Sequence, residues 1–397
     1  MDIRSAASGG RTAAAWGGVF AMSLCVFVLI ASEFMPVSLL TPIAADLALT
    51  EGQAGQAIAV SGIFAVVTSL SISHPAGGVD RRTVLLALTG LMLISGIIVA
   101  AAPDGAVLMA GRALLGVVIG GFWSMTTAVV MRLVPDYAVP RALALLNGGN
   151  ALATTIAAPL GSFLGGVIGW RGAFFCIAPL AAIAFVWQAC SLPRMPGGRR
   201  AGRSPFRLFQ RRPVASGMAA VLFLFMGQFA LFTYLRPFLE AVTRVDVDTL
   251  SALLLVIGIS GLIGTSLIGM VLTRSLGAAL IGMPLILGGI ALGLAVAGDR
   301  LWIVAPLLGL WGLVGTAAPV GWWTWLARTL PEDAEAGGGL MVAIIQAGIT
   351  VGAAAGGVLF DAGGHAATFI FAAGLLGLAA ALAVRAVTVR AMTGRAR

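Results

Sequence analysis

One carboxylate stands apart from the other ionisable residues of the chain. Glu33 lies inside the apolar run 26–40, whereas the remaining acidic residues fall at the ends of apolar runs or between them. A low-dielectric environment favours the neutral carboxyl group, so a change of surroundings makes such a residue take up or release a proton. We therefore predict that Glu33 is a proton carrier. A hydrated acid near a membrane interface is the alternative.

A second charge, Arg112, lies inside the apolar run 106–131. Residue counting at about 1.5 Å per helical residue places Glu33 and Arg112 at a similar depth below the same end of their helices. A guanidinium beside a carboxylate favours its ionised form, so a movement that separates the two would promote protonation. We predict a proton-coupling pair. Arg112 could instead only brace helices or loop carbonyls.

The joint after the second apolar run carries Asp80, Arg81 and Arg82. A carboxylate at this position can cap a neighbouring helix or pair with an arginine across the molecule. We predict that these three residues form a gate that stabilises a state closed on their side of the membrane. A solvated loop whose arginines only set topology is the alternative.

The composition indicates the scaffold that must hold these residues. Hydrophobic residues make up 59% of the 397 residues, charged residues make up 10%, and the mean hydropathy is +1.04. A soluble protein of this composition would expose large apolar areas to water, so we predict an all-α polytopic membrane protein. Twelve segments have the length of about 20 residues that a span requires. They are 16–39, 53–74, 83–102, 106–131, 141–167, 171–192, 214–237, 249–273, 277–297, 301–327, 338–361 and 366–387.

The arginines predict the topology. All 24 basic residues are arginine. With a cytoplasmic N-terminus, every arginine except five falls in cytoplasmic joints or tails, and this bias is typical of inner-membrane proteins. The exceptions are Arg112 in the membrane and Arg171, Arg236, Arg244 and Arg300 outside. We therefore predict that both termini are cytoplasmic and that the positive charge sets topology instead of binding nucleic acid.

The longest joint divides the spans six and six. It covers residues 193–213 and carries seven arginines. We predict a cytoplasmic tail at 1–15, a six-helix bundle at 16–192, a cytoplasmic linker at 193–213, a second six-helix bundle at 214–387 and a cytoplasmic tail at 388–397.

The two predicted bundles are weak repeats of each other. A shift of 195 positions aligns Gly161 with Gly356, Gly169 with Gly364 and Phe174 with Phe369. Parallel repeats of this kind hold a solute at the midplane between two bundles that rock around it. The same shift places Glu33 on Gln228 and Arg112 on Leu307, so only the first half has the ionisable pair.

Three short motifs resemble those of the major facilitator superfamily. They are the loop motif at 77–82, the fourth-span arginine motif at 108–121 and the antiporter motif at 158–161. The resemblance implies two six-helix bundles with alternating access, and it implies a gating role for Pro159 and Gly161 in the antiporter motif.

Longer stretches resemble the purine ribonucleoside efflux pumps of the bacterial drug:proton antiporter branch. They include 33–47, 121–125, 131–135, 158–165, 227–230, 232–237 and 319–325. The resemblance implies proton-driven export of purine ribonucleosides such as inosine and guanosine, and of base analogues, across the inner membrane. The expected partners are the solute, protons and the bilayer, with a monomeric protein and no cofactor besides the proton gradient.

A nucleoside needs a stacking platform and neutral polar groups that match its base edges. Residues of these types near mid-membrane are Asn150, Gln228, Trp311 and Gln346, with Phe122 and Trp123 deeper. We predict that they bind the solute. For the tryptophans, helix packing or interface anchoring is the alternative.

Other classes remain as alternatives. A broad drug or sugar efflux antiporter would share every architectural signal, and a proton symporter would differ only in direction. The sequence has no phosphate-binding loop, and its two histidines and three cysteines form no catalytic or metal-ligand spacing, so we predict a protein that is not an enzyme and binds no metal. A membrane-embedded enzyme or a lipid scramblase is the least favoured class.

Overall fold

Long apolar stretches become helices in this chain because a membrane-embedded backbone must satisfy its own hydrogen bonds. A computed structural model describes residues 15–72, 78–196, 205–330 and 334–394, and within these ranges it contains helices and no strand. Residues 1–14 of the predicted tail 1–15, Gly77 of the loop motif, linker residues 197–204 and residues 395–397 of the predicted tail 388–397 lie outside the described residues.

The helices follow the predicted spans closely. In chain order they are α1 (Trp16–Asp46), α2 (Glu51–Ser71), α3 (Arg81–Ala100), α4 (Gly105–Leu133), α5 (Val139–Phe175), α6 (Ile177–Ser191), α7 (Arg212–Phe232), α8 (Leu235–Phe238), α9 (Val247–Ala297), α10 (Leu301–Gly315), α11 (Ala318–Thr329) and α12 (Ala334–Gly394). Short helical turns lie at Asp136–Ala138, Pro205–Gln210 and Leu239–Thr243.

Three of the long helices turn back on themselves. Non-helical residues interrupt α5 at Gly169, α9 at Ser275 and α12 at Gly364. The part of α5 after Gly169 runs on into α6, the short α8 continues the pass of α7, and α10 and α11 form one pass, so the described residues cross the bundle twelve times, as the predicted spans require. Gly169 and Gly364 have φ values of 76° and 69°, a region that glycine adopts readily. The 195-position shift aligned these two glycines, so the repeat extends to backbone conformation.

The helix starts have local causes. Thr50 and Gln53 form a capping box at α2, in which each side chain bonds the other residue's backbone N–H at 3.0 Å. Asp104 and Asp246 cap α4 and α9 by accepting a backbone N–H three residues further on, each at 2.9 Å. These caps fix where the passes begin next to short loops.

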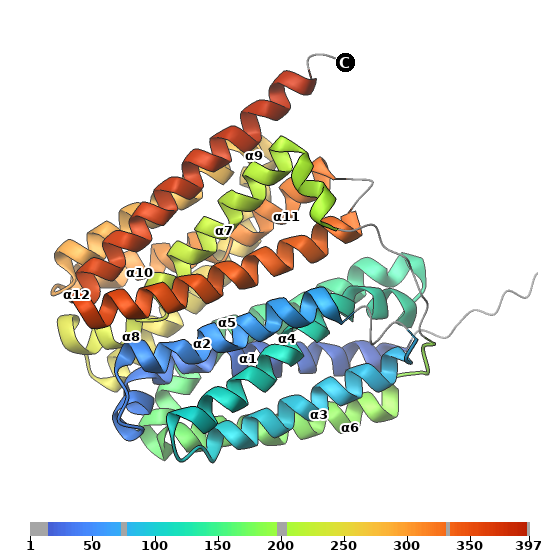
Figure 1. The fold of residues 1–397 in the computed structure, drawn as a ribbon, viewed down its shortest axis with the longest axis horizontal. Coiled ribbons are helices and arrows are strands. Elements are labelled where there is room, and N and C mark those ends of the chain that lie inside the picture. The colour runs from blue at the N-terminus through green and yellow to red at the C-terminus, as the bar shows by residue number, and fades with distance from the viewer. Residues whose placement is uncertain (1–14, 73–77, 197–204, 331–333, 395–397) are drawn as a thin grey trace, which may run out of the picture.

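The passes form two bundles with separate buried cores (Figure 1). The first half contains α1 to α6, and the second contains α7 to α12. The core of the second half also takes in residues of α1, α2 and α5, namely Val37, Ile58, Ala59 and Ala158. The two halves therefore pack directly on each other over part of their length.

The bundle has two distinct ends. We call the end with the start of α3 and residues 193–196 and 205–211 the linker end, and the opposite one the α1–α2 end. The first and last described residues both lie at the linker end (Figure 1). Ala15 is tied there by its N–H, which donates to the carbonyl of Leu133 at 2.8 Å. The arginine distribution predicts that this end faces the cytoplasm.

Candidate functional site

Arg112 of α4 is buried and joins three helices. Its Nη1 donates to the Ser32 carbonyl at 2.7 Å, and its Nη2 donates to the Glu33 carbonyl at 3.1 Å and to Ser61 Oγ at 3.0 Å. Its Nε donates to the Ala57 carbonyl at 3.1 Å. The guanidinium thus donates these hydrogen bonds to backbone and hydroxyl oxygens of α1 and α2.

A proline explains why Arg112 bonds this backbone. Pro36 lies inside α1 and has no N–H, so the carbonyl of Ser32, four residues earlier, loses its helical partner. Arg112 supplies that partner. The same arrangement recurs two turns further along α1, where Pro42 frees the Ser38 carbonyl and Arg236 of α8 donates to it. Each arginine donates a hydrogen bond to a carbonyl that lacks its helical N–H partner because of a proline.

Glu33 points to the second half of the molecule. Its Oε1 accepts a hydrogen bond from Nε2 of Gln346 on α12 at 3.3 Å, and both side chains are 5% exposed. Arg112 donates to the backbone carbonyl of Glu33, and in the described residues no hydrogen bond or ion pair joins its guanidinium to the Glu33 carboxylate. The structure thus matches the bracing alternative for Arg112, because Pro36 offers it a bare carbonyl.

Gln346 has one unsatisfied atom. Its Oε1 is buried and has no hydrogen-bond partner among the described residues, while its backbone carbonyl accepts from Thr350 Oγ1 at 2.7 Å. A buried amide oxygen without a hydrogen-bond donor is uncommon, and a ligand, a water or a protonated neighbour could supply that donor. Gln346, which was predicted to bind solute, is therefore hydrogen-bonded to Glu33, the predicted proton carrier.

The other predicted binding residues are spread more widely. Gln228 is half-buried on α7, with its amide nitrogen packed against Gly315 of α10, and Asn150 is half-buried on α5. Trp311 and Phe122 are 2% and 0% exposed and lie within the two hydrophobic cores, so neither presents a ring face for stacking in this state. Trp123 is half-buried against the core of the first half.

An aromatic contact beside Glu33 was missed by sequence reasoning. Phe34 stacks on Phe229 of α7 with ring centroids 5.6 Å apart, and Phe225 continues the stack at 6.5 Å. Phe34 follows Glu33 and Phe229 follows Gln228, the residue that the 195-position shift aligns with Glu33. The alignment of Glu33 with Gln228 was the sequence signal that could have predicted a contact between Phe34 and Phe229.

The halves are joined further at the α1–α2 end. Asp361 of α12 accepts from Thr50 Oγ1 at 2.6 Å and from the Gly52 N–H at 2.9 Å. Gln56 Nε2 donates to the Ala354 carbonyl at 3.3 Å. Together with the bond of Gln346 to Glu33, these contacts fasten the halves from the level of Glu33 to this end.

The predicted antiporter motif lies in this interface. Pro159 is buried in α5 and leaves the Thr155 carbonyl without its helical N–H. Thr155 meets Gly258 of α9, where an added Cβ would come within 2.8 Å of the threonine Cα. Gly161 packs on α1, where an added Cβ would lie 2.6 Å from Ser38 Oγ. The motif thus permits close helix contacts, both across the halves and within the first half.

Within the described residues, the hydrogen bonds of Asp80 in the predicted gate stay in the first half and the start of the linker. Asp80 caps its own helix, α3, by accepting the Arg82 N–H at 2.8 Å, and it also accepts the Met195 N–H at 3.0 Å. The Met195 N–H is the main reason that the pKa of Asp80 lies below its usual value. Arg82 donates to the Ala189 carbonyl at 2.5 Å, and the Arg81 N–H donates to the Met195 carbonyl at 2.9 Å. These bonds fasten the joint to the end of α6 and the start of the linker. Of the two roles predicted for Asp80, the structure shows the helix cap, with its carboxylate accepting from backbone N–H groups. The gating role stays a prediction.

Two helical bundles that meet around a buried acid and amide define a membrane transporter of the two-bundle class. Residues 22–341 match the Major Facilitator Superfamily, and the chain belongs to that family. It is therefore a transporter and not an enzyme.

The relatives agree on the family and differ in name. The chain is 56% identical over 384 residues to the transcription regulatory protein OpdE of Pseudomonas aeruginosa, covering 96% of each chain. It is 42% identical over 379 residues to the purine ribonucleoside efflux pump NepI of Salmonella typhimurium, covering 95% of this chain and 96% of that one.

Solved structures support the fold. A point mutant of the nucleoside transporter NupG superposes with a TM-score of 0.75 at 12% identity over 94% of this chain and 98% of its own. A bacterial homologue of the human lysosomal transporter Spinster, in an inward-facing and unoccupied conformation, gives a TM-score of 0.71 at 15% identity over 96% of each chain.

Proposed function

We propose that the chain is a proton-coupled antiporter that exports purine ribonucleosides, such as inosine and guanosine, across the bacterial inner membrane. The observation that carries the proposal is the buried Glu33 carboxylate held by Gln346 at the junction of the halves. Similarity to the purine ribonucleoside efflux pump over 95% of the chain supports the substrate class.

The hydrogen bond between Glu33 and Gln346 couples protonation of Glu33 to the movement of the two halves. With Glu33 ionised, its carboxylate holds the Gln346 amide N–H and links α1 to α12. The state described here is closed from Glu33 to the α1–α2 end, and solute enters from the linker end. When the halves rock and the α1–α2 end opens, Glu33 meets external protons. Protonation removes the anionic acceptor, weakens the polar network and favours release of the solute. The protonated carrier then returns and releases its proton at the linker end.

Arg112 acts as a fixed brace in this scheme. Its bonds to Ser32 and Glu33 carbonyls hold α1 at the Pro36 break, and the Glu33 side chain then projects toward α12. It is therefore a positioning residue, and Glu33 alone changes its protonation.

The experiment is nucleoside transport in proteoliposomes with and without an imposed pH gradient. For wild type we expect the gradient to drive radiolabelled inosine or guanosine. For Glu33→Gln, which keeps the size of the side chain, we expect loss of gradient-driven movement with retention of exchange of nucleoside for nucleoside. Gradient dependence in Glu33→Gln would remove Glu33 from the role. Transport of drugs or sugars without nucleosides would replace the substrate class and leave the coupling scheme standing.

The name of the 56% identical relative favours a second candidate, an effect on transcription. In this candidate the chain alters gene expression indirectly, by changing the internal concentration of the solute that it moves. The test is expression profiling of a deletion strain complemented with wild type or with Glu33→Gln. Restoration by wild type alone supports the indirect route, whereas equal restoration by both proteins assigns regulation to a function independent of transport.

A further inference from the structure

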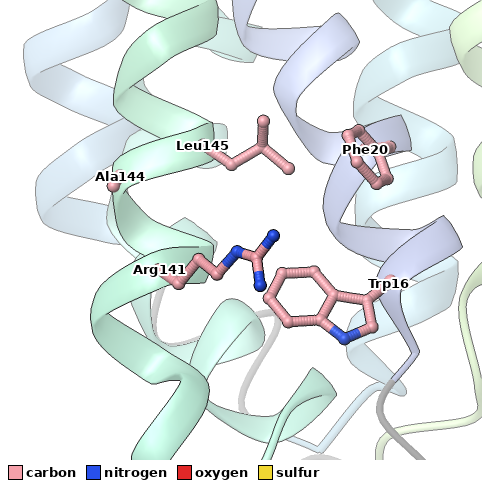
Figure 2. Close-up of a pocket in the computed structure, with 5 residues that line it drawn as sticks. All are labelled: Trp16, Phe20, Arg141, Ala144 and Leu145. Carbon is pink, nitrogen blue, oxygen red and sulfur yellow. The ribbon is translucent and has the colours of Figure 1, made fainter.

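A cavity of about 470 Å³ lies between α1 and α5 at the linker end, and no role has yet been given to it. Its lining residues are Trp16, Phe20, Arg141, Ala144 and Leu145, and we call it the vestibule. Figure 2 shows the Arg141 side chain extending from α5 toward the Trp16 indole on α1. The guanidinium carbon is 5.4 Å from the indole centroid. The vestibule therefore combines an aromatic face, a cation and an apolar wall.

The vestibule ends where the two helices touch. Ser23 Oγ donates to the Leu145 carbonyl at 2.9 Å. An added Cβ at Gly149 would lie 2.7 Å from Ser23 Oγ, so α1 and α5 are in contact there. The vestibule is thus a recess that is bounded on the side of the membrane centre.

The faces of α1 and α5 that line the vestibule continue along these helices to contacts with the second half of the molecule. Phe20 precedes Phe34 by fourteen residues, and Arg141 precedes Thr155 by fourteen. Fourteen residues make almost four helical turns, so each pair lies on nearly the same helix face. Phe34 and Thr155 contact Phe229 and Gly258 of the second half. The vestibule therefore lies on the interface side of the first half, toward the end opposite the contacts of Asp361 and Gln56.

The position suits a first binding site for a solute from the linker end. Phe20 lies thirteen residues before Glu33 on α1, which corresponds to roughly 20 Å along the helix. Phe27, half-buried, lies between them on the same face. A solute bound in the vestibule would thus have an apolar and aromatic surface leading to the Glu33 and Gln346 junction.

The chemistry selects among purines. An indole stacks on any purine. A guanidinium instead donates two hydrogen bonds to adjacent acceptors, as it does to O6 and N7 of guanine. A 6-oxopurine presents both acceptors on that edge, whereas a 6-aminopurine presents N7 and a donor that opposes the guanidinium. Phe20 and Leu145 can cover the opposite side of the base.

We propose that the vestibule is a recognition site for 6-oxopurine nucleosides, with Trp16 stacking on the base and Arg141 binding its O6 and N7. This proposal rests on the proposed function and adds the discrimination of inosine and guanosine from adenosine. Arg141 is exposed, so it can move from the indole face to the edge of an arriving base. The expected preference is about tenfold, the discrimination typical of one bidentate contact.

The test measures inosine uptake in proteoliposomes with competition by unlabelled inosine, guanosine or adenosine, for protein oriented with the linker end accessible. Wild type should require about ten times more adenosine than guanosine for half-inhibition. Arg141→Gln and Arg141→Lys should both bring this ratio close to one, because a lysine keeps the charge but not the two-pronged geometry. Trp16→Ala should weaken all three nucleosides similarly, and Trp16→Phe should restore most of the affinity.

The matched control is Arg274→Gln, which removes another exposed arginine, at the end of the first pass of α9, and should leave the ratio unchanged. A wild-type ratio near one, or an unchanged ratio in both Arg141 variants, would overturn the vestibule proposal while nucleoside transport stands. Wild type that moves no nucleoside would overturn the proposed function instead. Dependence of uptake on phosphatidylglycerol that disappears in Arg141→Gln, without base discrimination, would assign the vestibule to a lipid headgroup and also overturn the proposal.

Discussion

The two ends of the interface between the halves are built differently. At the α1–α2 end, polar contacts cross the interface, including those of Asp361 with Thr50 and Gly52 and of Arg236 with Ser38. At the linker end, the hydrogen bonds of Asp80 remain within the first half and the linker start, and the vestibule is open. Among the described residues, the polar contacts between the halves thus concentrate from the level of Glu33 to the α1–α2 end. Glu33 and Gln346 lie at the border between the closed and open parts.

The largest effect on stability should come from replacing Arg112, which holds α1 and α2 together next to Glu33. Arg112→Gln removes the donor of the Ser32 carbonyl and the guanidinium bonds to the Glu33 and Ala57 carbonyls, and breaking one partner of a buried charged network costs about 3 kcal/mol or more. We expect a markedly lower midpoint of thermal unfolding in detergent and loss of the closed state.

A double-mutant cycle with Pro36→Ala makes this prediction specific. The alanine restores an N–H for the Ser32 carbonyl, so Arg112→Gln should destabilise the Pro36→Ala background by about 1 kcal/mol less than it destabilises wild type. Pro284→Ala, which removes a proline from α9, is the matched control and should show no coupling with Arg112. Equal destabilisation in all backgrounds would contradict the role of Pro36.

How far the sequence predicts this arrangement depends on the kind of contact. Apolar length predicted the twelve passes, because each pass satisfies its own backbone in the membrane. Residue counting also placed Glu33 level with Arg112, whose Nη2 donates to the Glu33 carbonyl. Its partner Gln346 lies 313 positions away, and such a contact depends on how two helices rotate toward each other, which counting along one helix does not provide. For the same reason counting left solute binding and helix packing both open for Trp311, which lies in the core.

The contacts of Arg112 were partly accessible from the sequence. A guanidinium suits a carboxylate and a bare carbonyl equally well, so the fourth-span motif alone left both readings open. Pro36 was the signal that favours the carbonyl, because it lies four residues after Ser32. Asp361 gave no comparable signal, since it falls at the end of an apolar run like most acids of the chain.

The next effect should come from the close contact of α5 with α9. Gly258→Ala places a methyl group against the Thr155 backbone and forces the halves apart at this level. We expect the population closed at the α1–α2 end to fall about tenfold, the equivalent of roughly 1.4 kcal/mol. Distances between spin labels at exposed positions on the two halves would measure the shift.

Gly269→Ala is the control for that substitution. Gly269 lies on the same pass of α9, and an added Cβ there meets nothing within 4 Å. Its label distances should match those of wild type. If Gly258→Ala and Gly269→Ala give the same distances as wild type, the contact does not hold the closed state.

A smaller change should follow from neutralising Asp361, which joins the halves at the α1–α2 end. Asp361→Asn keeps the size of the side chain but removes the charge that accepts from Thr50 Oγ1 and the Gly52 N–H. Because the site is exposed, we expect a loss of about 1 kcal/mol or less, and so up to about fivefold more of the open form. Accessibility of a cysteine placed at Gln56 to a thiol reagent would report the opening. Asp299→Asn, an exposed acid at the same end that makes no contact between the halves in the described ranges, should leave the reaction rate unchanged.

The smallest effect on closure of the α1–α2 end should come from the linker end, where Asp80 bonds the first half and the start of the linker. Asp80→Ala removes the cap of α3 and the acceptor for the Met195 N–H, at a cost of about 1 kcal/mol in unfolding free energy near pH 7. The pKa of Asp80 is lowered in the folded protein, so its contribution is present above the ordinary aspartate pKa of about 3.9 and is lost as the pH falls through the lower folded value. The difference between wild type and Asp80→Ala should therefore stay constant from about pH 5 to 8 and shrink below about pH 4. Spin-label distances at the α1–α2 end should not change in this variant. A change in those distances would mean that the joint acts on closure of the opposite end, and the two ends would no longer be independent.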